Sequence, residues 1–354
     1  MNSELSLLAL DAYGKDRQRF LLTRLTEVWD RCADRADPTG IHDLRVLIRR
    51  FEEALRIFKS SAPKRGRKQV RRELRRTMRL AGRTRDVDIL RDSFIDADIT
   101  LSPALDLYLK NERASAEAAL RAVLAVGRAT DFHTRWRETL LLEEEQQAPR
   151  EAETQSVSAS TDEATSTPSG AKSMLPQLLE EYCVKGERLA QHETKPAKLH
   201  GLRLAGKHLR YSLEIFRPIY GRKMDELLAF LKETQTSLGQ ISDATASAAW
   251  IQEAELEQSD EIGQLQMYLE RRAQKGATRF REYWVDHWGL PSFRDHWIAY
   301  LGRYAGHGPS PQSATQPNDA VPDTADAASS QAAANTSEAA ADAQPSSEES
   351  SENP

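Results

Sequence analysis

Residues 41–58 read IHDLRVLIRRFEEALRIF, and the prediction of the fold starts from this stretch. Apolar residues recur every three or four positions from Leu44 through Phe51 to Phe58, which predicts an amphipathic helix with one buried face. A neighbouring stripe at the same spacing is basic and consists of His42, Arg45, Arg49 and Arg56, with Arg50 beside it. A single helix of this kind is typical of a bundle with a solvated charged face.

The sequence contains this helix pattern twice. Residues 199–216 read LHGLRLAGKHLRYSLEIF, and an offset of 158 positions aligns equivalent residues: His42 with His200, Arg45 with Arg203, Arg49 with Lys207, and Phe58 with Phe216. Further along, LAGRTRD at 80–86 matches SLGQISD at 237–243 after a deletion of one residue. An internal repeat of helical units explains these matches. Core packing requires the apolar matches but not the basic ones, so the pattern indicates that the basic face is used.

The rest of the chain shows helical periodicity and no alternating strand pattern, which predicts an all-α fold of two similar helical bundles related by a pseudo-two-fold repeat. We expect bundles at 1–142 and 172–308. The segments 143–171 and 309–354 are rich in Ser, Thr, Ala, Gln and Pro, lack an apolar period, and are predicted to be disordered.

The formal charge of −5 hides a strong segregation of charge. Residues 42–91 carry a local charge of +11 and residues 195–223 carry +7, whereas 143–171 carry −6 and 309–354 carry −8. A basic body with acidic flanks points to a polyanionic partner.

The helix that follows Pro63 is basic along most of its exposed side, through Arg67, Lys68, Arg71, Arg72, Arg75, Arg76 and Arg79. Like charges at i,i+4 repel each other. A helix that tolerates this repulsion without acidic partners is predicted to be a binding surface for phosphate-rich ligands.

Gly82 suits a helix C-terminus, and Thr84 suits the N-cap of a new helix. Ser242 occupies the corresponding place in the second half. We therefore interpret Asp86 and Asp243 as helix-capping residues rather than catalytic ones. As an alternative, Asp86 orients a neighbouring arginine.

Compartment signals are few. No run of eighteen apolar residues predicts a membrane span, and the N-terminus shows no cleavable signal pattern, so we expect a cytoplasmic protein. Cys32 and Cys183 lack metal-ligand spacing and are expected to be small buried residues.

These motifs resemble those of the conserved histidine α-helical domain, the CHAD family. The resemblance rests on His42-x-x-Arg45-x-x-x-Arg49, on GRTRD at 82–86, and on their counterparts in the second half, and it covers about residues 5–305. It implies two helical bundles around a basic groove or pore that binds inorganic polyphosphate, often at polyphosphate granules.

Together, the basic stripes and the resemblance predict a polyphosphate site and no cofactor or metal. Its residues are His42, Arg45, Arg49, Arg50, Arg72, Arg75, Arg76, Arg79, Arg83, Arg85, His200, Arg203, Lys207, Arg210 and Lys232. Arginine forks and lysine charges hold phosphate oxygens, and histidine adds charge near or below neutral pH.

Two departures from the repeat predict a lopsided site. Glu52 and Glu53 stand where the second half has Arg210 and Tyr211, which shortens the first basic stripe. The second half carries Ala229, Glu233 and Thr236 opposite Arg72, Arg76 and Arg79, so the first half should dominate binding.

Three alternatives remain open at this stage. Nucleic acid is a possible partner, although the basic helix lacks the interleaved aromatic residues that stack bases. His42-Asp43 invites comparison with metal-dependent HD phosphohydrolases, but His200-Gly201 breaks the motif and the other ligands are missing, so we expect no enzyme activity. Glu151-x-Glu153 lacks the lysine of the triphosphatases that accompany some CHAD modules. A metal site built from His42 and His200 has no surrounding carboxylates.

Overall fold

A computed structural model describes residues 2–143, 169–191, 196–254, 256 and 259–303. Every regular element in these ranges is a helix and none is a strand, which confirms the all-α prediction. No helix in the described ranges is both long enough and apolar enough to span a membrane. The predicted disordered segments 143–171 and 309–354 fall almost wholly outside the described residues, although Ser169 already begins a helix.

The first half consists of five helices: α1 (Asn2–Asp34), α2 (Pro38–Ile57), α3 (Lys64–Asp96), α4 (Pro103–Ala129) and α5 (Phe132–Leu140). Side-chain caps start three of them. Asp37 accepts a hydrogen bond from the Gly40 amide at 2.7 Å, and Ser102 and Asp131 cap α4 and α5 in the same way. α1 packs on α2 and α4, and α3 packs on α2, α4 and α5.

The second half is also built of helices. It contains α6 (Ser169–Ala190), α7 (Pro196–Tyr220), α8 (Met224–Glu253), α9 (Asp260–Tyr283), a π-helical turn η1 (Trp284–Trp288) and α10 (Pro291–Arg303). α7 packs on α6 and α8, and α8 packs on α9. Gly221, between α7 and α8, has a φ of +76°, a conformation that side chains with a Cβ rarely adopt.

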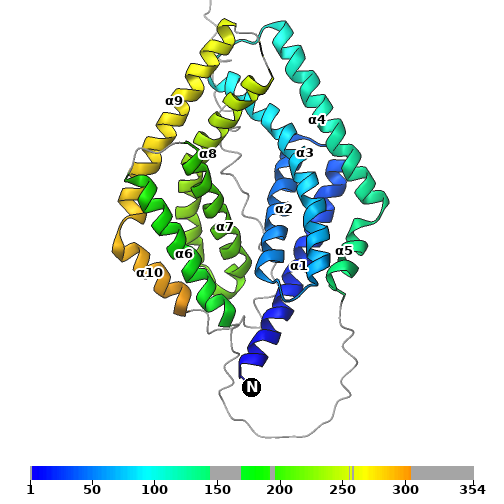
Figure 1. The fold of residues 1–354 in the computed structure, drawn as a ribbon, viewed down its shortest axis with the longest axis vertical. Helices are drawn as coiled ribbons and strands as arrows, with labels where there is room; N and C mark the ends of the chain where they lie inside the picture. Colours follow the sequence, from blue (N-terminus) through cyan, green and yellow to red (C-terminus); the bar gives the residue numbers. More distant parts are fainter. Residues whose placement is uncertain (1, 144–168, 192–195, 255, 257–258, 304–354) are drawn as a thin grey trace, which may run out of the picture.

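The two halves lie side by side in Figure 1, with α2 against α7 and α3 against α8. One apolar cluster runs through both: Phe58, which caps the C-terminus of α2, and Phe216 of α7 have ring centroids 5.8 Å apart, and Tyr13 of α1 stacks on Phe216. A second cluster joins the far ends of α3, α4, α8 and α9. α2 and α3 are therefore fixed by buried contacts on both sides.

The predicted break after Gly82 is wrong, because α3 continues through it to Asp96. Thr84 is buried and its hydroxyl donates to the Leu80 carbonyl within the same helix at 3.2 Å, so it caps nothing. α8 likewise continues past Ser242. Because α3 continues to Asp96, Leu90 and Phe94 are buried in the second apolar cluster, and this burial stabilises the longer helix. A mid-helix glycine costs only about 1 kcal/mol, which such burial offsets.

Candidate functional site: the basic face of α3 and the two His/Arg motifs

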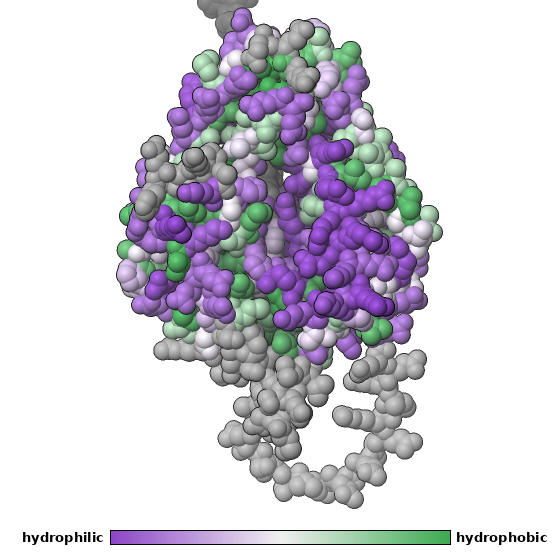
Figure 2. All heavy atoms as spheres, viewed as in Figure 1, coloured by the Kyte–Doolittle hydropathy of each residue, from purple (hydrophilic) through white to green (hydrophobic). Residues whose placement is uncertain are grey.

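The densest positive surface follows α3. We define the basic face of α3 as Arg65, Lys68, Arg72, Arg75, Arg76, Arg79 and Arg83, all of which are exposed. Figure 2 shows strongly hydrophilic side chains gathered over this part of the molecule. In the part of the chain that the structure describes, none of these seven side chains forms an ion pair with a carboxylate. Among the described residues, no ion pair offsets the repulsion among them, Arg75 alone is attracted at longer range by Glu52, and the face is available to an external anion.

The side of α3 that faces α2 carries further positive charge. Burial raises the pKa of Glu52 on α2, and the guanidinium groups of Arg71, Arg75 and Arg49 oppose this shift. Glu52 thus sits among three arginines from two helices. Arg71 is a candidate site residue that sequence reasoning left out of the predicted set; its position four residues before Arg75 was the available signal.

The first His/Arg motif, His42-x-x-Arg45 on α2, meets α3 at Gly82. A Cβ at Gly82 would lie 3.2 Å from Nη1 of Arg45, so the missing side chain leaves room for the guanidinium against the helix. Burial raises the pKa of Asp86, Arg45 opposes this effect, and Asp243 from the other half reinforces it. His42 is half-buried one turn before Arg45.

The second motif has a matching arrangement on α8. Arg203 lies against Gly239, where the ideal Cβ position is 4.0 Å from its Nε, and it pairs with Asp243 at 3.8 Å. The exposed His200 has its Nδ1 3.0 Å from the Ser242 hydroxyl. Lys185 of α6, which the sequence did not single out, donates to the Gly201 carbonyl at 2.8 Å beside it.

The capping roles predicted for Asp86 and Asp243 are therefore wrong, because both residues lie inside continuous helices. Asp243 instead pairs with Arg203, and Asp86 interacts electrostatically with Arg45. The alternative interpretation, in which Asp86 orients a neighbouring arginine, fits the geometry. No group of three or more metal-ligating side chains occurs among the described residues.

Two of the predicted arginines lie at the contact between the halves. Arg50 donates to Glu214 at 2.8 Å, and Arg210 donates to the same carboxylate at 2.9 Å and to Gln235 at 3.1 Å. Only 8% of Arg210 is exposed. These side chains tie α2 to α7 and α8 in addition to contributing positive charge.

Glu53 explains one of the departures from the repeat. It is 8% exposed and faces α7, where His208 Nδ1 lies 2.6 Å from its Oε2 and the Ser212 hydroxyl donates to its Oε1 at 2.8 Å. Arg56 on its own helix donates to the same carboxylate. The acid stands where the second half has Tyr211, and it holds α2 against the second half.

The remaining predicted residues are distributed over the same region. Arg85 pairs with Asp92 at 3.7 Å, and Lys207 is only 9% exposed, whereas Lys232 is half-buried. Both cysteines are buried as predicted, and burial raises the pKa of Cys32 to about 11 and that of Cys183 to about 12.

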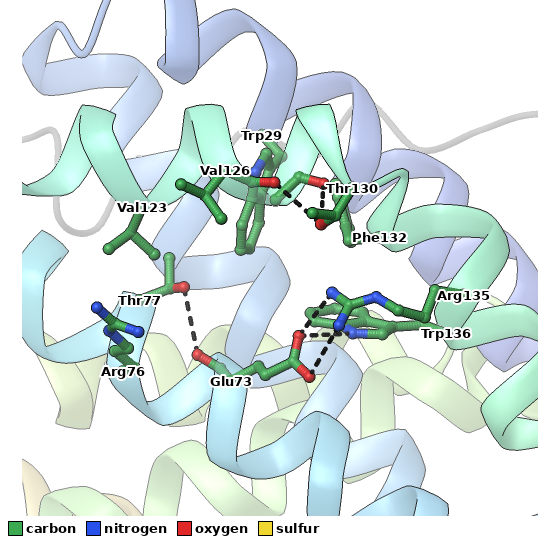
Figure 3. Close-up of a pocket in the computed structure, with 11 residues that line it drawn as sticks. Trp29, Glu73, Arg76, Thr77, Val123, Val126, Thr130, Phe132, Arg135 and Trp136 are labelled. Carbon is green, nitrogen blue, oxygen red and sulfur yellow. Dashed lines mark hydrogen bonds and ion pairs between the residues drawn. The ribbon is translucent and has the colours of Figure 1, made fainter.

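On its other side, α3 borders a small cavity of about 220 Å³ that α4 and α5 complete (Figure 3). Val123 and Val126 form one wall, and Trp136 lies opposite them. Glu73 lies at the floor, where it accepts hydrogen bonds from Arg135 at 3.0 Å and from Trp136 at 3.1 Å. Arg76 lines the cavity without an ion-pair partner among the residues described. The charge of α3 therefore reaches both of its flanks.

Comparison with known proteins identifies the fold. A crystal structure of the CHAD domain from the plant Ricinus communis matches with a TM-score of 0.54 and 20% identity, over 83% of this chain and 92% of that one. PptA from Streptomyces chartreusis matches with a TM-score of 0.52 and 15% identity, over 78% of this chain and 99% of that one. A search of curated proteins finds no match.

The sequence profile of the CHAD domain matches residues 20–252, about two thirds of the chain. This range begins within α1 and ends within the last turn of α8, so it contains both His/Arg motifs and the whole of α3. The chain belongs to the CHAD domain family.

Proposed function

We propose that this protein binds inorganic polyphosphate without catalysing a reaction on it. The observation that carries the proposal is the basic face of α3, seven exposed cations with no carboxylate partner in the described structure. From Arg65 to Arg83 this face is about 27 Å long at 1.5 Å per residue, which suits an extended polyanion rather than a single phosphate. Membership in the CHAD domain family supports the same ligand, because the family resemblance implies it.

The chemistry of the face fits a ligand that has charge but no bases. Guanidinium groups bind phosphate oxygens with charge-assisted hydrogen bonds, and they need no further recognition element to hold a uniform chain. Among the described aromatic side chains near α3, Trp29, Phe132 and Trp136 are buried within the bundle. They leave no exposed ring on the basic face for base stacking.

We further infer that the two halves are copies of one unit related by a pseudo-two-fold axis. Supporting this, Arg45 lies against Gly82 and Arg203 lies against Gly239, and Asp86 and Asp243 occupy equivalent positions behind them. In this proposal the halves form the walls of one groove, and α3 makes the first half dominant.

The proposal also includes a cellular location, the cytoplasm at polyphosphate granules. Fluorescently tagged protein should then redistribute when cells are depleted of polyphosphate. Unchanged distribution would contradict the location but not the binding.

A direct titration tests the binding. Arg49→Gln combined with Arg75→Gln removes two charges around Glu52, and Arg222→Gln combined with Lys223→Gln removes two charges from exposed positions at the turn before α8. We expect polyphosphate affinity to fall at least about tenfold for the first variant, because two charge-assisted contacts are lost. The control variant should change it by much less. Equal losses would contradict a localised site.

Nucleic acid is the second candidate, favoured by the same unpaired cations. Labelled single-stranded RNA or DNA bound to the protein should be displaced by long-chain polyphosphate at matched ionic strength and a lower phosphate concentration. Displacement that requires a large excess of polyphosphate would favour nucleic acid instead.

A further inference from the structure

The cavity between α3, α4 and α5 is lined mainly by apolar side chains (Figure 3). Three buried rings, those of Trp29, Phe132 and Trp136, contact one another along it, and we name them the aromatic wall. The ring centroids of Trp29 and Phe132 lie 4.5 Å apart, and those of Phe132 and Trp136 lie 4.9 Å apart. An apolar cavity of about 150 Å³ accommodates benzene, so a cavity of about 220 Å³ has room for one aromatic ring and a short substituent.

One cation at the cavity has no carboxylate partner among the described residues. Glu73 accepts a hydrogen bond from Arg135 at 3.0 Å, so these two charges offset each other. The hydroxyls of Thr77 and Thr130 donate to backbone carbonyls one turn earlier in the chain. Arg76 is the remaining cation, and it leaves the cavity with a net positive charge.

This charge and the rings lie at different ends of the cavity. In Figure 3, Arg76 lies at one end beside Val123, and Trp136 lies at the other end. Ligand pockets are typically apolar, with a few polar groups that fix the orientation of the ligand. A ligand with a ring at one end and an acidic group at the other therefore matches the cavity. Polyphosphate does not match it, because polyphosphate has no apolar part to cover the rings.

The second half has neither the acid nor the cation of this cavity at the aligned positions. Phe230 occupies the position of Glu73, and its ring packs edge-on against Phe293 with centroids 4.8 Å apart. Glu233 occupies the position of Arg76 and pairs with an arginine of α9 at 2.8 Å. A ring and a closed ion pair in the second half thus stand where the first half has an open cavity and a cation without a carboxylate partner among the described residues.

We propose that this cavity binds a small aromatic carboxylic acid, with its ring at the aromatic wall and its carboxylate at Arg76. An added ring extends the edge-to-face contacts of the aromatic wall, and a guanidinium group binds a carboxylate with charge-assisted hydrogen bonds. The inference does not rest on the proposed function, because a chain that binds no polyphosphate would still have the cavity and its cation.

The test uses 3-phenylpropionate as the probe and 3-phenylpropanamide as its neutral analogue of nearly the same shape. Both are titrated by calorimetry against the wild-type full chain, Arg76→Gln and Arg72→Gln, after melting curves establish that the variants are folded. Arg72 is the matched control, because it is an exposed arginine one turn away on α3 that does not line the cavity. Arg76→Gln should lower the affinity for the acid at least about fivefold and that for the amide less than about twofold, because only the acid loses a charge-assisted contact. Arg72→Gln should change both affinities by less than about twofold.

Nuclear magnetic resonance of the indole N–H groups locates the bound acid. It should shift the signals of Trp29 and Trp136 and leave unchanged that of Trp288, which is buried in the second half. The inference would be overturned if the wild-type chain did not bind the acid, if Arg76→Gln affected the acid no more than the amide or no more than Arg72→Gln does, or if the signal of Trp288 alone shifted. Displacement of the acid by an equal concentration of tripolyphosphate would also overturn it, because the acid would then occupy a phosphate site.

Discussion

Gly82 shows how one missing side chain links the fold to the site. It lies in the middle of α3, where alanine would favour the helix, yet its Cβ position is 3.2 Å from the guanidinium of Arg45. Contacts of that length require the neighbour to move by a few tenths of an ångström. The glycine therefore positions Arg45 at a cost in helix propensity of about 1 kcal/mol.

We predict that Gly82→Ala stabilises the protein by about 0.5–1 kcal/mol and weakens polyphosphate binding, because the new methyl group displaces Arg45. Gly239→Ala is the matched control, since its nearest neighbour, Arg203, is at an ordinary contact distance of 4.0 Å. Denaturant unfolding and ligand titration measure the two effects. Undiminished binding by Gly82→Ala would show that the contact has no role in positioning Arg45.

Glu53 predicts a pH-dependent contribution to stability. Burial alone would raise its pKa, but the hydrogen bonds from His208 and Arg56 outweigh burial, and the pKa is lowered from the ordinary value of 4.5. A carboxyl group with a lowered pKa stabilises the fold above its unfolded pKa, and this stabilisation is lost as pH falls through the folded value.

Glu53→Gln should therefore reduce the free energy of unfolding at pH 7 by about 1.5–3 kcal/mol, because charge-assisted hydrogen bonds between the halves are lost. The difference from the wild type should shrink as the pH falls below 4.5. Glu27→Gln, which removes an exposed partner of Arg24, should change stability little at any pH. A Glu53 effect that is independent of pH would contradict the assignment.

At the residue scale, the sequence showed which side chains have the chemistry of a phosphate site, but it did not show which residues they pair with in the fold. His42, Arg45, His200 and Arg203 were identifiable because they recur at one offset. The pairing of Glu53 with His208 was not, because it joins helices 155 positions apart and no local pattern encodes it. Arg210 was predicted to contact ligand; the structure shows that it is 8% exposed and that it also donates to Gln235 of α8, a partner that the sequence did not indicate.

Among the elements, α3 is distinguished by charge that its own fold does not neutralise. Helical periodicity predicted its existence and its basic side. The periodicity could not show that α3 and α8 are continuous, because glycine and threonine give the same local signal at a helix end and at a close helix contact. The deciding factor was the second apolar cluster, which forms only when distant helices meet.

Replacing Arg72, Arg76 and Arg79 with Gln should leave the melting temperature unchanged or raise it at low salt. Glutamine keeps helix propensity, and each relieved i,i+4 repulsion is worth about 0.2–0.5 kcal/mol. Polyphosphate affinity should fall by far more than after the equal charge change at Arg222, Lys223 and Lys232. A marked drop in melting temperature would mean that these arginines have structural partners, and equal affinity losses would refute the lopsided site.

For the whole molecule, the separation of charge along the chain predicts the effect of truncation. Residues 309–354 carry eight acidic residues and no Lys or Arg, and residues 143–170 are also strongly acidic. Removing 309–354, or shortening 143–170, should leave the melting transition intact, and polyphosphate binding should persist or strengthen as acidic competitors leave. Loss of the cooperative transition in either variant would show that the removed segment supports the core.

The helical class of the molecule and its family were accessible from the sequence, because periodicity and the four ordered motifs extend over most of the chain. The way the halves meet was not. Tyr13, Phe58 and Phe216 each look like ordinary core residues, and only the folded chain brings their rings together across the halves.

The salt dependence of polyphosphate affinity tests the central claim most directly. If the basic face of α3 binds the phosphates of polyphosphate, the counterions condensed on the polyphosphate are released. The logarithm of the association constant should then fall linearly with the logarithm of salt concentration. The slope should become shallower when Arg72, Arg76 and Arg79 are replaced with Gln. An affinity that stays flat between low and moderate salt, or a slope that the triple replacement leaves unchanged, would contradict the account.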